Sequence, residues 1–364
     1  MILLIICAVA AGYQLFAIMS CLDASWKTRG MRGGVWRGRP PRVRQMLISI
    51  LKPVRGTDGN LEAALGSHSK LQGDYELLCG VSSLDDPAVA VIRKFPKARV
   101  IQCSTVTPNA KVGVLIDLMK AARRDIIIVN DSDICVEPDY LDRVTAPLAD
   151  PQVGLVTCLY RAVGDTFAAR FEALGVSTDF APSTLVARLV GVDEFAMGST
   201  LAFRRADAEK IGGFESFADY LADDYQLGHR IHSLGLKCVL ADTIVETHLG
   251  GSWVDVWRHQ VRWARTIRVS KFWGYLGLPV TFATVWALVC PNWHFGLAIL
   301  ATRMAMAIVA GWFKMRSIDV LKLFWLIPAR DLFGAAVWAV GLFGNTVVWR
   351  GRMLHLDQDG RIKA

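Results

Sequence analysis

Cysteine pairs and metal-binding clusters are missing from this 364-residue chain. Its eight cysteines are scattered, with no Cys-x-x-Cys pair and no group of His and Cys at zinc spacing. The pattern gives no support for a zinc module, and it predicts reduced, mostly buried thiols.

Acidic residues are missing between Lys27 and Arg44, where every charged side chain is basic. A second group of basic residues, from Arg258 to Lys271, directly precedes an apolar region. The basic residues behind the formal net charge of +8 are therefore concentrated in particular segments of the chain. Basic residues beside apolar segments are typical of the cytosolic membrane surface, so we expect contact with a membrane and none with nucleic acid.

Charged residues are scarce at the N-terminus, where residues 1–22 are nearly all apolar. This length suffices to cross a hydrocarbon core of about 30 Å at about 1.5 Å per residue. The stretch has neither a basic leader nor a small-residue cleavage site, which predicts an uncleaved anchor. The basic residues that follow it predict a cytosolic location for the next domain.

Hydropathy and charge also set the other expected boundaries. After the anchor, we expect a catalytic domain at 42–250, an amphipathic interfacial helix at 251–273, a membrane region at 274–349 and a tail at 350–364.

Within the membrane region, residues 276–313 predict two short helices separated by a turn near Pro291. A last apolar stretch contains Arg330 and Asp331. Because charges are costly inside lipid, its helix is expected to begin near Leu332.

The middle of the chain alternates between strand-like and helical patterns. Several strand-like runs are continuously apolar, as strands buried on both faces are. We therefore predict an α/β fold with a mainly parallel sheet and flanking helices, whose ligand site lies at the carboxyl ends of the strands. The predicted strands are Met46–Leu51, Tyr75–Val81, Arg99–Cys103, Ile126–Asn130, Val153–Tyr160, Thr200–Phe203 and Lys237–Leu240. The predicted helices include Pro87–Phe95, Val112–Arg123 and Asp219–Ser233.

The segment Asn130-Asp131-Ser132-Asp133 follows the buried run DIIIV. Two carboxylates at i and i+2 can hold one divalent cation, which can bridge the two phosphates of a nucleotide diphosphate. Such a triplet also occurs in ordinary turns, but its position at a strand end favours a metal site formed by Asp131 and Asp133.

Two further acidic pairs lie near predicted helix starts. Asp85 and Asp86 precede Pro87, where Asp86 is either a simple helix cap or a contact to a uracil or ribose. Asp223 and Asp224 open a later helix, where the helix dipole alone would favour acids. Inverting sugar transfer needs a carboxylate base, and Asp224 is the candidate.

The segment His259-Gln260-Val261-Arg262-Trp263 lies on the presumed interfacial helix. Arg262 is predicted to neutralise a departing diphosphate, and Trp263 to stack on a sugar or enter the interface. A basic helix lying on lipid is the alternative.

Two single residues are weaker candidates. Lys111 opens a helix and could reach a phosphate, although an exposed lysine is the simpler interpretation. His248 follows a strand-like run and could be a third metal ligand, although a structural histidine is favoured.

The motifs LKPVRG, DDPA, DSD, ADDY and RW, in this order, resemble family-2 glycosyltransferases of the GT-A fold. Within that family the chain is similar to the ceramide glucosyltransferase group and to the hopanoid-associated glycosyltransferases. The tail ARDLFGAAVWAVGLFGNTVVWRGR also resembles that group, so the similarity covers nearly the whole chain.

The resemblance implies a role for each motif. It assigns Asp85 or Asp86 and Lys111 to the nucleotide, and Asp131 and Asp133 to the metal diphosphate. It assigns Asp224 to the general base, and Arg262 with Trp263 to the signature pair. Two positions depart from the group. His259 replaces a usual Gln or Arg, and Asp223 replaces a frequent Glu.

The resemblance also implies a reaction, namely inverting transfer of a hexose from a UDP-sugar to the hydroxyl group of a membrane lipid with Mg²⁺ or Mn²⁺ as cofactor. UDP-glucose and ceramide are the expected substrates. Transfer of N-acetylglucosamine to a hopanoid or another lipid, a processive polysaccharide synthase and a nucleotide-binding membrane scaffold are the alternatives. The chain is expected to be an integral membrane protein with a cytosolic catalytic domain.

Overall fold

A computed structural model describes residues 1–22, 35–36, 47–57, 60–349 and 351–363 of the chain. The chain forms two compact units. The first unit combines residues 1–22 with Arg161–Val190 and Leu249–Lys363, and the second combines the described residues between 35 and 160 with Gly191–His248. Residues 161–190 therefore group with the terminal segments, although they lie in the middle of the sequence.

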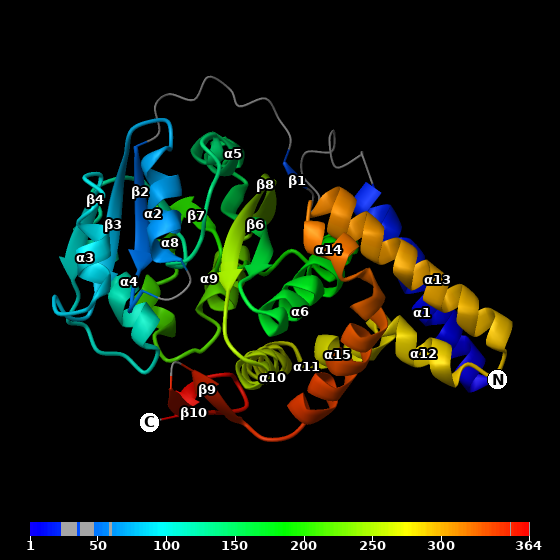
Figure 1. Cartoon of the computed structure of the whole chain (residues 1–364). Coiled ribbons are helices and arrows are strands. Elements are labelled where there is room, and N and C mark those ends of the chain that lie inside the picture. Colours follow the sequence, from blue (N-terminus) through cyan, green and yellow to red (C-terminus); the bar gives the residue numbers. More distant parts are fainter. Residues whose placement is uncertain (23–34, 37–46, 58–59, 350, 364) are drawn as a thin grey trace. The chain divides into compact units, whose positions relative to one another are not determined.

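An eight-stranded sheet of order β1-β8-β6-β7-β5-β2-β3-β4 forms the centre of the second unit (Figure 1). The pairs β1/β8, β5/β2, β2/β3 and β3/β4 are parallel, while β7 is antiparallel to both β5 and β6. The strands are β1 (Val35–Trp36), β2 (Ile48–Pro53), β3 (Tyr75–Val81), β4 (Ala98–Gln102), β5 (Ile126–Val129), β6 (Val153–Gly164), β7 (Leu201–Arg204) and β8 (Lys237–Leu249). A mainly parallel sheet is what the sequence predicts.

Both faces of this sheet are covered. Successive residues of a strand point to opposite faces, so Leu77 and Leu78 of β3 enter two different apolar cores. Leu77 belongs to the core with Leu61 of α2, and Leu78 to the core with Leu115 of α4. Burial on both faces explains the continuous apolar runs. All seven predicted strands are present. Strands β6 and β8 are longer than predicted, because polar residues at their ends interrupt the apolar pattern on which the prediction was based.

Helices flank the sheet in the second unit. They are α2 (Leu61–Ser69), α3 (Ala88–Ile92), α4 (Ala110–Ala121), α5 (Tyr140–Thr145), α8 (Arg205–Lys210) and α9 (Asp223–Ser233). The three predicted helices correspond to α3, α4 and α9, while α2, α5 and α8 are not among them. Helix α4 begins where the side chain of Asn109 accepts a hydrogen bond of 3.1 Å from the backbone N–H of Lys111.

The first unit contains the apolar helices. These are α1 (Ile2–Leu22), α12 (Ala283–Val289) and α13 (Trp293–Ala307), the last continued by a π-helical segment, Ile308–Lys314. Helix α1 lies alongside α13 (Figure 1). Two helices of the described chain, Ile2–Leu22 and Trp293–Lys314, are long and apolar enough to cross a membrane. Phe272–Thr281 and Ala283–Val289, between which the chain bends by 59°, are a third candidate if the two together form one span.

The predicted break near Pro291 is confirmed. Helix α12 ends at Val289 and α13 begins at Trp293. The side chain of Asn292 accepts a hydrogen bond of 3.1 Å from the backbone N–H of Phe295, which caps the new helix.

The predicted start of the last helix is wrong. Helix α15 runs over Ile327–Gly341, so Arg330 and Asp331 lie inside it instead of before it. Both are buried, but Asp331 accepts hydrogen bonds from the guanidinium group of Arg303 at 2.7 and 3.0 Å. A charge in an apolar region is tolerated when it is paired, and a partner distant in sequence could not be identified from hydropathy.

The remaining elements of the first unit include several that the sequence does not predict. Helices α6 (Phe167–Gly175) and α7 (Ala181–Leu189) are joined by a π-helical segment, Val176–Phe180. The segment predicted to be interfacial, 251–273, contains α10 (Trp253–Ser270) and the start of α11 (Phe272–Gly277), and α14 (Ile318–Lys322) precedes α15. The predicted membrane stretch up to residue 349 ends in β9 (Thr346–Trp349), which pairs with β10 (Arg352–Leu356), and β10 pairs with β11 (Ile362–Lys363).

The buried pair of Arg303 and Asp331 yields a stability prediction. We expect Asp331→Asn to lower the free energy of unfolding by about 2 kcal/mol, because Arg303 loses one of its two buried counter-charges and keeps Asp179. The measurement is thermal unfolding of the detergent-solubilised chain. The double variant Arg303→Met/Asp331→Leu should recover part of the loss, because it removes both charges of this pair and leaves Asp179 its ion pair with Arg330. An unchanged unfolding temperature for Asp331→Asn would contradict the prediction.

Candidate functional site

Hydrogen bonds from two buried side chains, Asn130 and Lys52, hold the turn after β5 in place. The side-chain amide of Asn130 donates hydrogen bonds to the hydroxyl group of Tyr140 at 2.9 Å and to the carbonyl oxygen of Ser199 at 2.7 Å. The ammonium group of Lys52 donates to the carbonyl oxygens of Asp131 at 2.9 Å and Ile134 at 3.4 Å. Asp131 and Asp133 are therefore presented on a rigid backbone.

Lys52 is a residue whose importance the sequence does not reveal. It lies in β2 and is completely buried, and this burial lowers the pKa of its ammonium group to about 8. Burying a lysine disfavours its charged form, so the position opposes stability at neutral pH unless its hydrogen bonds compensate. In the sequence Lys52 is only a single lysine directly after the predicted strand Met46–Leu51, so nothing nearby marks it as buried.

Lys111 connects two acidic segments of the chain. Its ammonium group lies 2.9 Å from Oδ1 of Asp131, after β5, and 3.0 Å from Oδ2 of Asp223, at the start of α9. Burial alone would lower the pKa of Lys111, but the charges of Asp131 and Asp223 outweigh burial and raise it. Lys111 is thus a fixed cation between carboxylates, and the interpretation as an exposed surface lysine is wrong.

Asp224 lies beside this ion-pair network. Its Oδ2 accepts a hydrogen bond of 2.8 Å from the backbone N–H of Gly198, and its Oδ1 accepts one of 2.8 Å from that of Tyr225. Burial, and then the negative charge of Asp223, raise the pKa of Asp224 to about 6. A carboxylate with such a pKa is suited to take up a proton near neutral pH.

Gly198 shows how closely these groups approach one another. A methyl group added there would lie 3.3 Å from Oδ2 of Asp131, 3.3 Å from Oδ2 of Asp224 and 3.6 Å from the ammonium group of Lys111. The side chains come from the ends of different elements, as expected for an α/β sheet. The structure therefore brings Lys111, Asp131 and Asp224 together around one point.

Asp133, in the same turn, is held by a residue of β8. Its Oδ2 accepts a hydrogen bond from the hydroxyl group of Thr247. Burial, and then the charge of Asp131, raise the pKa of Asp133. A nearby cation would oppose both effects, so this carboxylate is placed where positive charge is favoured.

The donor set at the turn fits a hard divalent cation. In the described residues, no group of three or more His, Cys, Asp or Glu side chains is arranged to hold a metal ion. Mg²⁺ is commonly bound by one or two carboxylates, with substrate phosphates and water as the other ligands. Asp131, whose side chain is 40% exposed, and Asp133 match that mode. Nε2 of His248 lies 3.4 Å from Oε1 of Glu246, and its role, structural or metal-binding, stays a prediction.

The acidic pair before α3 divides into two environments. Both carboxylate oxygens of Asp86 accept hydrogen bonds from the backbone N–H of Gly56, at 3.0 and 3.1 Å, and Oδ1 also accepts one of 2.9 Å from Ala88. The bond from Ala88 is of the kind that the capping alternative predicts, and contact of Asp86 with a nucleotide stays a prediction. Asp85 is exposed, and its contact with a nucleotide stays a prediction.

The signature segment lies in the first unit, on α10. A reciprocal pair of hydrogen bonds between Ser252 and Asp255 starts this helix. Arg262 and Trp263 are half-buried, and the indole ring packs edge-on against the ring of His259, with centroids 4.6 Å apart. Their roles in a reaction stay predictions.

Glu172 explains the unusual His259. Its Oε1 lies 2.6 Å from Nδ1 of His259 and accepts a hydrogen bond of 2.7 Å from the side chain of Gln260. Burial would raise the pKa of Glu172, but the hydrogen bond and charge of His259 outweigh burial and lower it. His259 therefore has a buried partner on α6, which no motif in the sequence indicates.

Comparisons with known proteins agree with this arrangement. A family model described as glycosyl transferase family 21 matches residues 2–362. Ceramide glucosyltransferase 1 of Caenorhabditis elegans is 30% identical over 204 residues, which are 53% of this chain and 44% of that protein. Ceramide glucosyltransferase 3 of the same organism is 26% identical over 351 residues, which are 86% of this chain and 74% of that protein. The match thus spans less than half the length of the first relative.

One solved structure supports the fold prediction. It is the mannosyltransferase PcManGT from Pyrobaculum calidifontis in complex with GDP-Man and Mn²⁺. It is 17% identical and aligns over 94% of this chain and 98% of its own, with a TM-score of 0.55. The predicted GT-A fold is confirmed.

Asn130 yields a prediction about the site's scaffold. We expect Asn130→Ala to lower the free energy of unfolding by about 2 kcal/mol, because the buried oxygens of Tyr140 and Ser199 lose a donor. Thermal unfolding in detergent measures the change. Ser132→Ala, in the same turn, is the matched control and should unfold close to the wild-type temperature. Equal unfolding temperatures for the two variants would refute the assigned role of Asn130.

Proposed function

This chain belongs to glycosyl transferase family 21, and on that premise we propose that it transfers a hexose from a UDP-sugar to the hydroxyl group of a membrane lipid. Glucose as the sugar and ceramide as the acceptor are the proposed pair, in keeping with the two curated relatives. The observation that carries the proposal is the convergence of Asp131, Asp224 and Lys111 around Gly198.

The donor's diphosphate is proposed to lie at the turn after β5. A divalent cation held by Asp131 and Asp133 would neutralise the charge that develops on the diphosphate. Lys111 lies beside Asp131 and supplies a second, fixed positive charge there. Asp85 is proposed to accept hydrogen bonds from the nucleoside.

Asp224 is the proposed general base. Its carboxylate takes the proton of the lipid hydroxyl group while that oxygen attacks the anomeric carbon of the sugar. The bond from this carbon to the diphosphate breaks, its electron pair leaves with UDP, and the configuration inverts. The raised pKa of about 6 lets Asp224 remain ionised at neutral pH and still bind a proton during the reaction.

The first unit is proposed to provide the acceptor side. Its apolar helices support association with a membrane, where a lipid acceptor would be found. Arg262 is proposed to stabilise the departing diphosphate, and Trp263 to contact the sugar or the acceptor. The catalytic unit is proposed to face the cytosol, as the basic residues after the N-terminal anchor indicate.

A substrate panel tests this function. The purified full-length chain is incubated with labelled UDP-glucose or UDP-N-acetylglucosamine and with ceramide, a hopanoid polyol or diacylglycerol. We expect glucosylceramide, and no product after chelation of divalent cations. Transfer of N-acetylglucosamine to the hopanoid would identify the alternative reaction, and absence of UDP release with every lipid would indicate a scaffold.

Asp224 gives the sharpest mechanistic prediction. We expect Asp224→Asn to lower kcat by at least about 100-fold while UDP binding changes little, since only proton transfer is lost. In the wild-type protein, kcat/KM should fall as the pH drops through about 6, because the base must be ionised and its pKa is raised to that value. Initial rates across the pH range, together with calorimetric UDP binding, measure both effects.

Asp74→Asn is the matched control for this experiment. Asp74 is a half-exposed carboxylate paired with Arg124. Its replacement should leave kcat and the pH profile unchanged. A wild-type rate in Asp224→Asn would refute the base assignment, whereas loss of UDP binding in that variant would place Asp224 at the donor instead.

A further inference from the structure

Glu172 is a buried charged residue on α6. Its side chain is 3% exposed, and its neighbours in sequence, Phe171, Ala173 and Leu174, are buried apolar residues. Burying an ionised carboxylate is costly, and apolar residues of similar volume often stabilise a protein as well as a buried ionic contact does. The position therefore points to a role that an apolar side chain could not perform.

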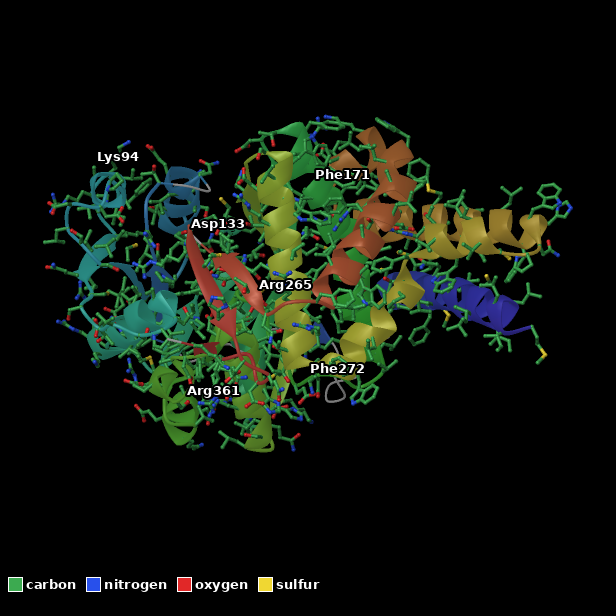
Figure 2. The ribbon with its side chains drawn as sticks, turned by 90° about the horizontal axis from the view of Figure 1, so that it is seen from below. Lys94, Asp133, Phe171, Arg265, Phe272 and Arg361 are labelled. Carbon is green, nitrogen blue, oxygen red and sulfur yellow. The ribbon has the colours of Figure 1, made fainter. Side chains whose placement is uncertain are left out.

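Aromatic packing already joins α6 to the neighbouring helices. The ring of Phe171 packs edge-on against that of Trp253, at the start of α10, with centroids 5.2 Å apart. It packs in the same way against Phe333 of α15, at 5.5 Å, and Figure 2 shows Phe171 where α6 lies beside α15. These contacts hold the helices together without the carboxylate of Glu172.

Glu172 fixes the hydrogen on one ring nitrogen of His259. Burial opposes the ionisation of Glu172, but the hydrogen bond and charge of His259, with smaller contributions from Gln260 and Arg330, outweigh burial and lower its pKa. An ionised carboxylate only accepts hydrogen bonds. Nδ1 of His259, 2.6 Å from Oε1 of Glu172, must therefore be the donor, and the imidazole ring is held in one orientation.

His259 in turn contacts the tryptophan of the signature pair. His259 and Trp263 lie four residues apart, one above the other on α10. Their rings meet edge-on, with centroids 4.6 Å apart. The indole ring also lies 6.0 Å from the ring of Phe180, which ends the π-helical segment after α6. If the imidazole ring rotated away, the indole would lose one of these two aromatic neighbours.

Glu172 also orders the residue that follows His259. Its Oε1 accepts a hydrogen bond of 2.7 Å from the side-chain amide of Gln260, whose own oxygen accepts one of 2.9 Å from Arg330 of α15. Gln260 and Arg330 are both buried. Hydrogen bonds to α6 and α15 therefore fix the rotation of α10 about its axis, and this rotation sets the direction of Trp263.

We propose that Glu172 is a positioning residue for sugar transfer, which acts through His259 to hold the indole ring of Trp263 in the orientation that the reaction requires. This role rests on the proposed function, in which Trp263 contacts the sugar or the acceptor. Glu172 itself touches no substrate. A misplaced indole ring would weaken contacts made in the transition state and leave binding of the donor's nucleotide almost unchanged.

A double-mutant cycle tests this role. Initial rates are measured for the full-length chain in detergent, with the UDP-sugar and lipid of the substrate panel that the wild type uses fastest. We expect Glu172→Leu and His259→Ala each to lower kcat at least about tenfold and to change KM for the UDP-sugar by less than about twofold. The double variant should match His259→Ala within about twofold, because Glu172 acts only through His259.

Glu172→Gln separates the hydrogen bond from the charge. The amide of glutamine keeps an oxygen that can accept from His259 but carries no charge, so kcat should lie between that of Glu172→Leu and that of the wild type. Thermal unfolding shows which variants are folded. If Glu172→Leu does not fold, Glu172→Gln takes its place in the cycle.

Asp319→Asn is the matched control. Asp319 of α14 pairs with Arg170 of α6 at 2.6 Å, so it also joins α6 to another helix, but the pair includes no residue of α10. This variant should keep the wild-type kcat.

Losses that add in the double variant, a wild-type kcat in folded Glu172→Leu, or an equal loss in Asp319→Asn would overturn the positioning role and leave the proposed reaction standing. Absence of sugar transfer by the wild type would instead overturn the proposed reaction, and this role with it.

Discussion

The carboxylates of Asp131 and Asp223 would repel each other without a cation, and the ammonium group of Lys111 lies between them. The arrangement of the second unit depends on this lysine. Lys111 contacts Asp131 and Asp223 within 3.0 Å, and these two residues are separated by more than ninety positions in the sequence. The ion pairs join the turn after β5 to the start of α9. Without Lys111, the charges of Asp131, Asp223 and Asp224 would favour separation or proton uptake, and the proposed base would lose its defined environment.

The neighbouring aspartates Asp223 and Asp224 have different electrostatic surroundings. Asp223 pairs with Lys111 directly, whereas Asp224 is bonded to the backbone N–H groups of Gly198 and Tyr225. Burial, and then the negative charge of Asp223, raise the pKa of Asp224, and they outweigh the opposing charge of Lys111 and the backbone hydrogen bond from Tyr225. Two adjacent aspartates thus occupy different electrostatic environments. This difference makes Asp224 the better candidate for proton transfer.

Buried polar groups in the first unit follow a related rule. Glu172 holds His259 and Gln260, Gln260 accepts a hydrogen bond of 2.9 Å from Arg330, and Arg303 pairs with Asp331. Each of these charged groups has a partner from a separate segment of the chain, which lowers the cost of its burial. The helix that carries Arg262 and Trp263 is consequently held by specific bonds as well as by apolar packing.

The sequence alone determined seven of the eight strands of the central sheet, because strands buried on both faces must be continuously apolar, and it also located the acidic motifs at strand and helix ends. It indicated the apolar helices, since crossing a bilayer requires long apolar runs. Hydropathy could not place the start of α15, identify Glu172 as the partner of His259 or reveal the buried role of Lys52. Tertiary structure decided these features, because each depends on a hydrogen-bonding or ionic partner that is distant in the chain and leaves no local pattern.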